Sequence, residues 1–310
     1  MSKTAFLFPG QGSQSVGMLA DLGEETMIRQ TFQEASGALG YDLWELIQQG
    51  PEDALNSTDK TQPALLASGV ALWRLWQQRG AARPDFLAGH SLGEYTALVC
   101  AGVINLGDAV RLVERRGQLM QLAVPAGTGG MAAILGLEDD QVRQACASAA
   151  DGDVVEAVNF NAPGQVVIAG SSAAVERAIA ACKEAGAKRA MPLPVSVPSH
   201  CALMKPAAEQ LAEVLASLNM HAAEIPVINN VDVAIETDSS QIRDALVRQL
   251  YSPVRWVETV QRLVAEGVSH GYECGPGKVL GGLVKRIDKQ LTMMSLENAQ
   301  AFEAALGGTQ

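Results

Sequence analysis

Short apolar segments alternate with longer helical patterns as far as Pro125, and this alternation limits the fold more than any other feature of the chain. Thr4–Phe8 and Asp85–Gly89 are short runs typical of buried strands, and Pro9 with Gly10 ends the first of them. Helical patterns occupy these segments: Met27–Leu39, Gln62–Gln78, Leu92–Cys100 and Gly107–Ala123. Strands that alternate with helices predict a parallel sheet wound on both faces.

The pattern changes after the glycine-rich segment Pro125–Gly130, where the expected helices and strands become short. The expected order is strand, helix, strand, strand, helix, strand, over these segments: Met131–Gly136, Asp139–Ala150, Val154–Phe160, Gln165–Gly170, Ala173–Ala185 and Lys188–Val195. This βαββαβ order is the ferredoxin-like unit. The longer rhythm returns after Pro198, so we expect an α/β chain with a large domain at 1–125 and 198–310 and a small inserted domain at 126–197.

In that second part of the large domain, helical and strand patterns alternate again. The expected helices are Lys205–Leu218, Ser240–Leu250, Val254–Glu266 and one that begins at Val279. The expected strands are Ile225–Asn229 and a segment near Tyr272, and a short helix with a frayed end follows Asn298.

Composition excludes several classes of protein. Of 310 residues, 48% are apolar and 18% charged, which suits a large folded core. The net charge of −11 is opposite to that of a typical nucleic-acid binder. Five cysteines without a CxxC pair argue against a disulfide framework and favour a reducing, cytoplasmic location. The apolar run near the N-terminus is too short for a signal peptide, and we expect no membrane-spanning segment.

The segment Gly89-His90-Ser91-Leu92-Gly93 matches the G-x-S-x-G nucleophile elbow. A nucleophile on a sharp strand-to-helix turn needs small neighbours two positions away on each side, and a strand and a helix flank this one as the motif requires. The helix then begins beside Ser91, and the Leu92 amide becomes a candidate oxyanion donor. The alternative is a tight turn that carries an exposed serine.

A second oxyanion donor is expected from the loop Gly10-Gln11-Gly12-Ser13, which follows the first strand. A dinucleotide fingerprint would need glycine at the sixth position of this loop, where Ser15 stands, and the lysine of a P-loop is absent. A plain glycine-rich turn remains the alternative to an oxyanion loop.

Four histidines are candidates for the base. His90 lies within the elbow, so its side chain should point away from that of Ser91. His200 follows the strand-like run Val195-Ser196-Val197 at the return to the large domain, where a cleft is expected. His221 follows a helix and fits a cap or surface position, and His270 lies just before a strand. The pattern favours His200 by a narrow margin, and spacing assigns no acid to orient it; Cys201 beside it is expected to be a buried, inert thiol.

Arg116 lies in the middle of the apolar face of the helix expected over Gly107–Ala123. A charged group at such a position must be paired. One interpretation is a structural salt bridge to an internal carboxylate. The other is a bidentate fork for the carboxylate of a substrate, a geometry that lysine cannot reproduce.

These residues and their surroundings resemble the malonyl-CoA:acyl carrier protein transacylases of bacterial fatty-acid synthesis. The resemblance covers nearly the whole chain and is carried by these ordered motifs: Phe8–Gln14, Gly89–Glu94, Arg115–Gly117, Asn159–Gln165, Val197–Met204, Gln249–Val254 and Glu273–Gly277. It implies a hydrolase-like α/β domain with a ferredoxin-like insertion, and ping-pong transfer of malonyl from malonyl-CoA to the phosphopantetheine thiol of acyl carrier protein.

The resemblance also implies a role for each site residue. Ser91 is acylated, His200 is its base, and the main-chain carbonyl of Gln249 orients His200, so that the site is a dyad. Gln11 and Leu92 supply the oxyanion amides, and Arg116 holds the malonyl carboxylate. The implied chemistry needs no metal or redox cofactor.

Two rival functions remain at this point: a serine esterase or thioesterase that passes the acyl group to water, and a silent scaffold that binds carrier protein. We expect no nucleic acid or membrane partner, and a monomer. Since carrier protein is acidic, docking should use a local basic patch, for which the candidates are Lys188, Arg189, Lys278, Lys285, Arg286 and Lys289.

Overall fold

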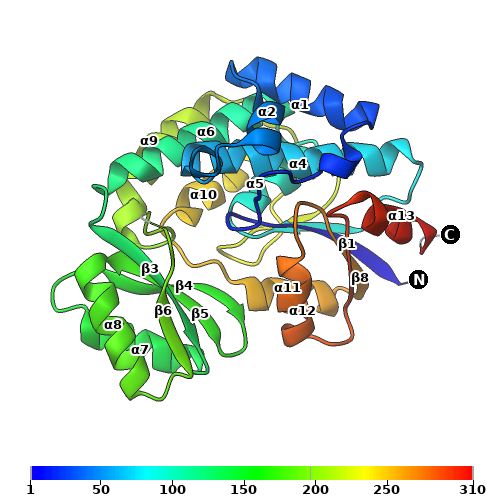
Figure 1. The fold of residues 1–310 in the computed structure, drawn as a ribbon. Helices are drawn as coiled ribbons and strands as arrows, with labels where there is room; N and C mark the ends of the chain where they lie inside the picture. The colour runs from blue at the N-terminus through cyan, green and yellow to red at the C-terminus, as the bar shows by residue number, and fades with distance from the viewer. Residues whose placement is uncertain (1, 196, 309–310) are drawn as a thin grey trace.

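The computed structural model describes residues 2–195 and 197–308, and within them the chain forms two separate sheets (Figure 1). The larger sheet has the strand order β7-β2-β1-β8-β9, and every neighbouring pair is parallel. Its strands are β1 (Lys3–Phe8), β2 (Phe86–Gly89), β7 (Val227–Ile228), β8 (Val268–Glu273) and β9 (Thr292–Ser295). The predicted α/β class with a parallel sheet is confirmed.

Helices cover both faces of this sheet, and β1 explains why. Phe6 and Phe8 point into one core cluster, whereas Ala5 and Leu7 point into a second cluster on the opposite face. A strand that is buried on both faces reads as a continuous apolar run, which is why the first strand could be recognised from sequence.

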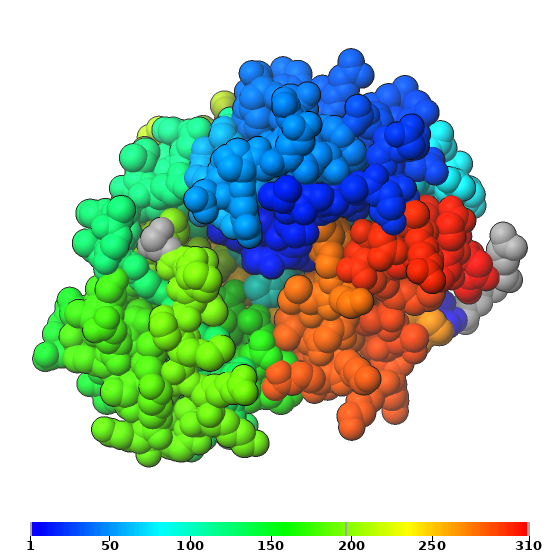
Figure 2. Space-filling view, in the orientation of Figure 1, coloured from blue at the N-terminus to red at the C-terminus, as the bar shows by residue number. Residues whose placement is uncertain are grey.

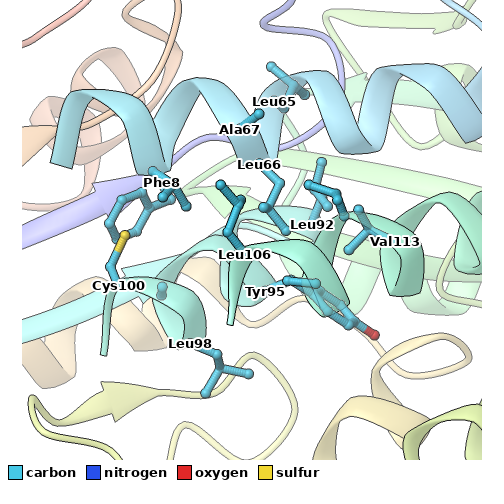
Figure 3. Packing of buried hydrophobic residues seen from close by; sticks show 14 of the residues in the cluster. Phe8, Leu65, Leu66, Ala67, Leu92, Tyr95, Leu98, Cys100, Leu106 and Val113 are labelled. Carbon is cyan, nitrogen blue, oxygen red and sulfur yellow. The ribbon is translucent and has the colours of Figure 1, made fainter. Parts of the chain in front are cut away.

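The first face is covered by α1 (Thr26–Leu39), α4 (Thr58–Gln78), α5 (Leu92–Cys100), α6 (Leu106–Ala123), α9 (Lys205–Ser217), α10 (Ser239–Gln249) and α13 (Ala299–Gly307). The second face is covered by α11 (Trp256–Ala265) and α12 (Val279–Ile287). Figure 3 shows Leu66 of α4 and Leu92 of α5 lying toward each other, and both belong to one apolar cluster. This packing holds the helix that follows the elbow.

The smaller sheet is antiparallel and has the order β4-β5-β3-β6. Its elements follow one another as β3 (Gly129–Leu135), α7 (Asp139–Ala149), β4 (Val155–Ala162), β5 (Gln165–Ser171), α8 (Ser172–Glu184) and β6 (Arg189–Pro192). The order is βαββαβ, as expected for a ferredoxin-like unit, and the sheet has its own apolar core with α7 and α8. The sheet lies within the interval of 126–197 that the sequence suggested for the small domain.

Several local expectations were wrong. The chain forms two short helices that we did not expect, α2 (Leu43–Gln49) and α3 (Glu52–Leu55). The helix predicted over Val254–Glu266 begins at Trp256 instead, because Val254 exchanges backbone hydrogen bonds with β4 of the small domain. The strand predicted up to Val195 ends at Pro192.

Other boundaries differ by a few residues. The helix α4 begins four residues before the expected Gln62 and carries Pro63 in its first turns, and Asn161 and Ala162 belong to β4 rather than to a turn. Two short 3-10 helices, η1 (Ala20–Leu22) and η2 (Ala202–Met204), complete the description. Ser196 of the run before His200, and Thr309 and Gln310 of the tail, lie outside the described residues.

The small domain sits beside the end of the parallel sheet where β1 and β2 finish. Figure 2 shows the surface hollowed between the green small domain and the blue and orange segments of the large one. The β4–Val254 pairing joins the two domains through backbone, with Phe160 N and Val254 N as donors at 3.0 and 2.9 Å. In the part of the chain that the structure describes, no helix combines the length and apolarity needed to cross a membrane.

Candidate active site

Ser91 occupies the sharp turn between β2 and α5, with φ 53° and ψ −109°. L-residues rarely adopt this backbone conformation, and it recurs at functional sites. The turn is closed so tightly that a Cβ at Gly89 would overlap the backbone of Gly93, and a Cβ at Gly93 would overlap the carbonyl of Phe8. Both glycines of the motif are therefore required by contact, as the sequence suggested.

His200 is the histidine that meets Ser91, at 2.8 Å between Nε2 and the serine Oγ. Its Nδ1 lies 2.7 Å from the main-chain oxygen of Gln249. A carbonyl oxygen only accepts, so Nδ1 carries the proton and Nε2 of the neutral ring is left to accept from the serine hydroxyl. This is the tautomer that a general base requires.

The electrostatics keep His200 neutral. Burial and the nearby positive charge of Arg116 lower its pKa to about 3, while the bond to Gln249 acts in the opposite direction. The imidazole has no carboxylate partner among the described residues, and a backbone dipole takes the place of the aspartate of a full triad.

Gln11 and Leu92 both line the pocket in front of Ser91. The two amides come together because β1 and β2 are adjacent and in register, with Phe8 opposite Gly89, so that the turns after them share one edge of the sheet. Within the described residues, neither amide donates a hydrogen bond. The N-terminus of α5 adds its positive dipole end at the same place.

Arg116 is 1% exposed, and its guanidinium contacts neutral oxygens. Nη1 donates to Gln62 Oε1 at 2.8 Å, and Nη2 donates to Gln249 Oε1 at 3.1 Å and to Ser91 Oγ at 3.4 Å. No ion pair to Arg116 is formed among the described residues, which removes the salt-bridge interpretation. A buried cation with no carboxylate in direct contact, beside the nucleophile, is suited to an anionic ligand.

Four buried polar side chains at the site were missed by sequence reasoning: Gln62, Glu94, Asn230 and the amide group of Gln249. Glu94 Oε2 accepts from Gln249 Nε2 at 2.8 Å, and burial raises the pKa of Glu94 to about 7. Glu94 could have been recognised as a candidate site residue, because it is a carboxylate in the first turn of a helix that is otherwise mostly apolar.

The remaining histidines lie apart from the reacting groups. His90 turns away from Ser91, as expected: its Nε2 is 2.8 Å from Asn161 Oδ1, and its ring packs on Trp256. His221 and His270 are exposed. Cys201 is buried with its pKa raised to about 12 by desolvation, so it holds no thiolate at neutral pH.

All of the reactive groups open into one pocket of about 520 Å³ between the two domains. The large domain contributes Gln11, Ser57, Ser91, Leu92, Arg116, Met120 and His200, and the small domain contributes Met131, Asn159, Asn161, Val167 and Leu193. This volume suits an acyl group and part of a thiol-bearing arm, and its lining combines the buried Arg116 with apolar and amide side chains of the small domain.

Comparison with known proteins agrees with this geometry. The family model described as acyl transferase domain matches residues 5–298. The malonyl CoA-acyl carrier protein transacylase of Salmonella typhimurium is 64% identical over 307 residues, with 99% of each chain covered, and that of Escherichia coli K12 is 63% identical with the same coverage.

Two solved structures also resemble this chain over almost its whole length. An acyl carrier protein S-malonyltransferase from Vibrio cholerae has a TM-score of 0.96 at 64% identity and covers 98% of this chain and 100% of its own. A malonyl-transacylase in complex with its type II PKS acyl-carrier protein has a TM-score of 0.98 at 58% identity, with 99% and 100% covered. The chain belongs to the acyl transferase domain family and, within it, to the malonyl CoA-acyl carrier protein transacylases.

Proposed function

We propose that this chain transfers malonyl from malonyl-CoA to the phosphopantetheine thiol of acyl carrier protein through a malonyl-Ser91 intermediate. One observation carries the proposal: Ser91 Oγ lies 2.8 Å from His200 Nε2 and 3.4 Å from Arg116 Nη2. A nucleophile between a base and an unpaired cation fits a substrate that has both a thioester and a carboxylate. The solved relative in complex with its acyl-carrier protein supports a carrier thiol as acceptor.

The first half-reaction acylates Ser91. His200 Nε2 takes the hydroxyl proton while Oγ forms a bond to the thioester carbon of malonyl-CoA. The oxyanion is stabilised by the amides of Gln11 and Leu92. The carbon–sulfur bond then breaks, the proton on Nε2 passes to the departing thiolate of CoA, and malonyl-Ser91 remains.

The second half-reaction runs the same steps in reverse order with a different thiol. His200 Nε2 takes the proton of the phosphopantetheine thiol while its sulfur attacks the malonyl ester, and the same two amides stabilise the oxyanion. The bond to Ser91 Oγ breaks, and the proton returns from His200 to the serine. No metal or redox cofactor takes part in the proposed steps.

The malonyl carboxylate has a second effect beyond binding. Arg116 is one of the two main causes of the low pKa of His200. A carboxylate on the guanidinium offsets its positive charge, so the pKa of His200 rises and the imidazole becomes a stronger base. The correct acyl group therefore activates the base that acts on its own thioester.

Three of the six candidate docking cations, Lys188, Arg189 and Arg286, lie around one turn where the two domains touch, and Lys285 and Lys289 are close to Arg286 in sequence. Arg286 Nη2 donates to Pro163 O at 3.2 Å in the β4–β5 turn, and Gly164 O of the same turn accepts from Gly136 N at 2.8 Å. Lys188 lies against Gly136, and Arg189 follows it. Lys285 lies beside Arg286 on α12 and Lys289 follows the helix; both are exposed.

We propose that this basic patch (Lys188, Arg189, Lys285, Arg286 and Lys289) docks acyl carrier protein. The sixth candidate, Lys278, is paired with Glu297 at 3.3 Å and is left out. Lys285→Ala with Lys289→Ala should raise the apparent KM for carrier protein and leave malonyl loading of Ser91 unchanged. Arg83→Ala is the control, since Arg83 is an exposed cation near the start of β2, at the opposite end of that strand from Ser91. Equal effects of the two changes would contradict the docking site.

The acceptor is tested by incubating the enzyme with malonyl-CoA alone, with carrier protein lacking phosphopantetheine, and with the complete carrier. Transfer predicts one burst of CoA without an acceptor, and continued release with a malonyl mass gain only on the complete carrier. A thioesterase would release CoA continuously without carrier, and a silent scaffold would release none.

We also propose a cytoplasmic location and a monomeric state. The first rests on the five cysteines, each of which is buried and free. The second rests on the exposed large apolar side chains of Val16, Leu122, Met191 and Val279, which are spread over separate segments.

A further inference from the structure

The turn at Ser91 needs support from outside the elbow. A positive φ at a residue with a side chain is unfavourable, and such conformations persist only where the surrounding structure fixes them. Inside the elbow, Gly93 N donates to His90 O and Glu94 N donates to Ser91 O, which are ordinary bonds of a first helical turn. These bonds leave the amide of Ser91 and the carbonyl of Gly89 without partners within the segment.

Asn230 satisfies both groups with one side chain. Its Oδ1 accepts from Ser91 N at 2.7 Å, and its Nδ2 donates to Gly89 O at 2.7 Å. The side chain is fully buried and arrives from the adjacent strand, because β7 ends two residues before Asn230 and pairs in parallel with β2. One planar amide therefore spans the two peptide groups that flank His90.

Glu94 fixes the backbone of Asn230 in turn. Its Oε2 accepts from Asn230 N at 2.9 Å and from Gln249 Nε2 at 2.8 Å. Gln249 also donates through Nε2 to Ser91 O at 3.1 Å, and its main-chain oxygen holds His200. One buried carboxylate, that of Glu94, thus helps to position both the backbone of Ser91, through Asn230 and Gln249, and the ring of His200, through Gln249.

We propose that Asn230 is a positioning residue for acyl transfer: it holds the Ser91 backbone so that Oγ faces His200 Nε2. It also occupies the Ser91 amide, so that the neighbouring Leu92 amide is the one left free for the oxyanion. The inference rests on the proposed role of Ser91 as nucleophile. Asn230 is out of the pocket and touches no substrate, so it acts through Ser91 alone.

The test compares Asn230→Ala with Asn229→Ala. Asn229 is the neighbouring residue and is also buried, at 5% exposure against 0% for Asn230, but its Oδ1 accepts from Asp232 N and it makes no bond to the elbow. Asn230→Asp is the conservative variant, because its carboxylate still accepts from Ser91 N and cannot donate to Gly89 O. For each variant, a rapid-mixing experiment measures the rate constant of Ser91 malonylation and its half-saturating malonyl-CoA concentration. Thermal melting is recorded in parallel.

Loss of two hydrogen bonds to the turn should slow malonylation about 10- to 100-fold in Asn230→Ala, with half-saturation changed less than about threefold. Asn230→Asp should lie between Asn230→Ala and the wild type. A small sulfonyl fluoride that reacts with Ser91 without using Arg116 should be slowed by a similar factor, since the defect is in the nucleophile. Asn229→Ala should stay within about threefold on every rate, whatever its melting temperature.

The inference is overturned if Asn229→Ala slows malonylation as much as Asn230→Ala does, or if Asn230→Ala affects half-saturation alone. If Asn230→Ala does not fold, Asn230→Asp decides: a wild-type rate overturns the inference, and a reduced rate at unchanged half-saturation supports it. Failure of the proposed function is a different result, in which the wild-type enzyme itself gains no malonyl group at Ser91.

Discussion

Replacement of Arg116 by glutamine should change which acyl group the enzyme accepts. The guanidinium is buried, is held by the side-chain oxygens of Gln62 and Gln249, and has no acidic partner among the described residues. A malonyl carboxylate would be its counter-charge, whereas an acetyl group offers none. The variant should therefore lose affinity for the malonyl transition state and lose little for acetyl.

The magnitude follows from the contacts that disappear. A hydrogen bond to a charged group contributes about 1.5–3 kcal/mol, which corresponds to about a 10- to 150-fold loss in kcat/KM for malonyl-CoA. Arg116→Lys should be intermediate, because it keeps the charge and loses the planar fork. The freed oxygens of Gln62 and Gln249 cost stability as well, so the melting temperature should fall in Arg116→Gln.

The assay is single-turnover release of CoA from malonyl-CoA and from acetyl-CoA, with wild type and both variants at equal enzyme concentration. The ratio of kcat/KM for malonyl-CoA over acetyl-CoA should fall by about one to two orders of magnitude in Arg116→Gln. A variant that loses activity toward both thioesters by the same factor would refute this expectation, because Arg116 would then support the fold or the dyad rather than the carboxylate.

Three further predictions follow from the same geometry. Gly89→Ala should give an inactive and destabilised protein, because its Cβ would overlap the backbone of Gly93; melting and malonylation measure both, and an active variant would contradict the tight turn. Burial raises the pKa of Glu273 from 4.5 to about 7, although its carboxylate accepts from Leu280 N. The folded chain thus holds that proton more tightly than the unfolded chain, and its contribution to stability declines as pH rises from 4.5 to about 7. Glu273→Gln should flatten that decline in melting temperature between about pH 5 and pH 8, and an unchanged slope would count against it. Because the pKa of His200 is low, the pH profile of kcat/KM for malonylation should have no acid limb near pH 6.5. An acid limb near pH 6.5 that is traced to His200 would show that its imidazole has an ordinary pKa.

The parallel sheet could be read from the sequence because its strands are buried on both faces. Phe6 and Phe8 face one core and Ala5 and Leu7 the other, so the run is apolar without interruption. The elbow could also be read, because steric demand fixes glycine at two positions. In contrast, Val254 pairs with β4 of the small domain instead of starting the predicted helix, and no local sequence pattern indicates a pairing with a distant strand.

The site could be predicted only in part, for a related reason. Ser91 and His200 are 109 positions apart in sequence, and spacing alone could not decide among the histidines; the resemblance to the transacylases did. Arg116 could be recognised because it is a charged residue on the apolar face of a helix. Gln62 and Asn230 could not be recognised, because nothing in the sequence distinguishes a buried amide from an exposed one until its hydrogen-bond partners are known.

The most direct test of the central claim is the intact mass of the enzyme after brief mixing with malonyl-CoA, with the modified residue located by peptide mapping. One malonyl group is expected on the wild type, attached at Ser91, and none on Ser91→Ala. A wild type that gains no malonyl group, or a Ser91→Ala variant that gains as much as the wild type, would contradict the assignment of Ser91 as the nucleophile.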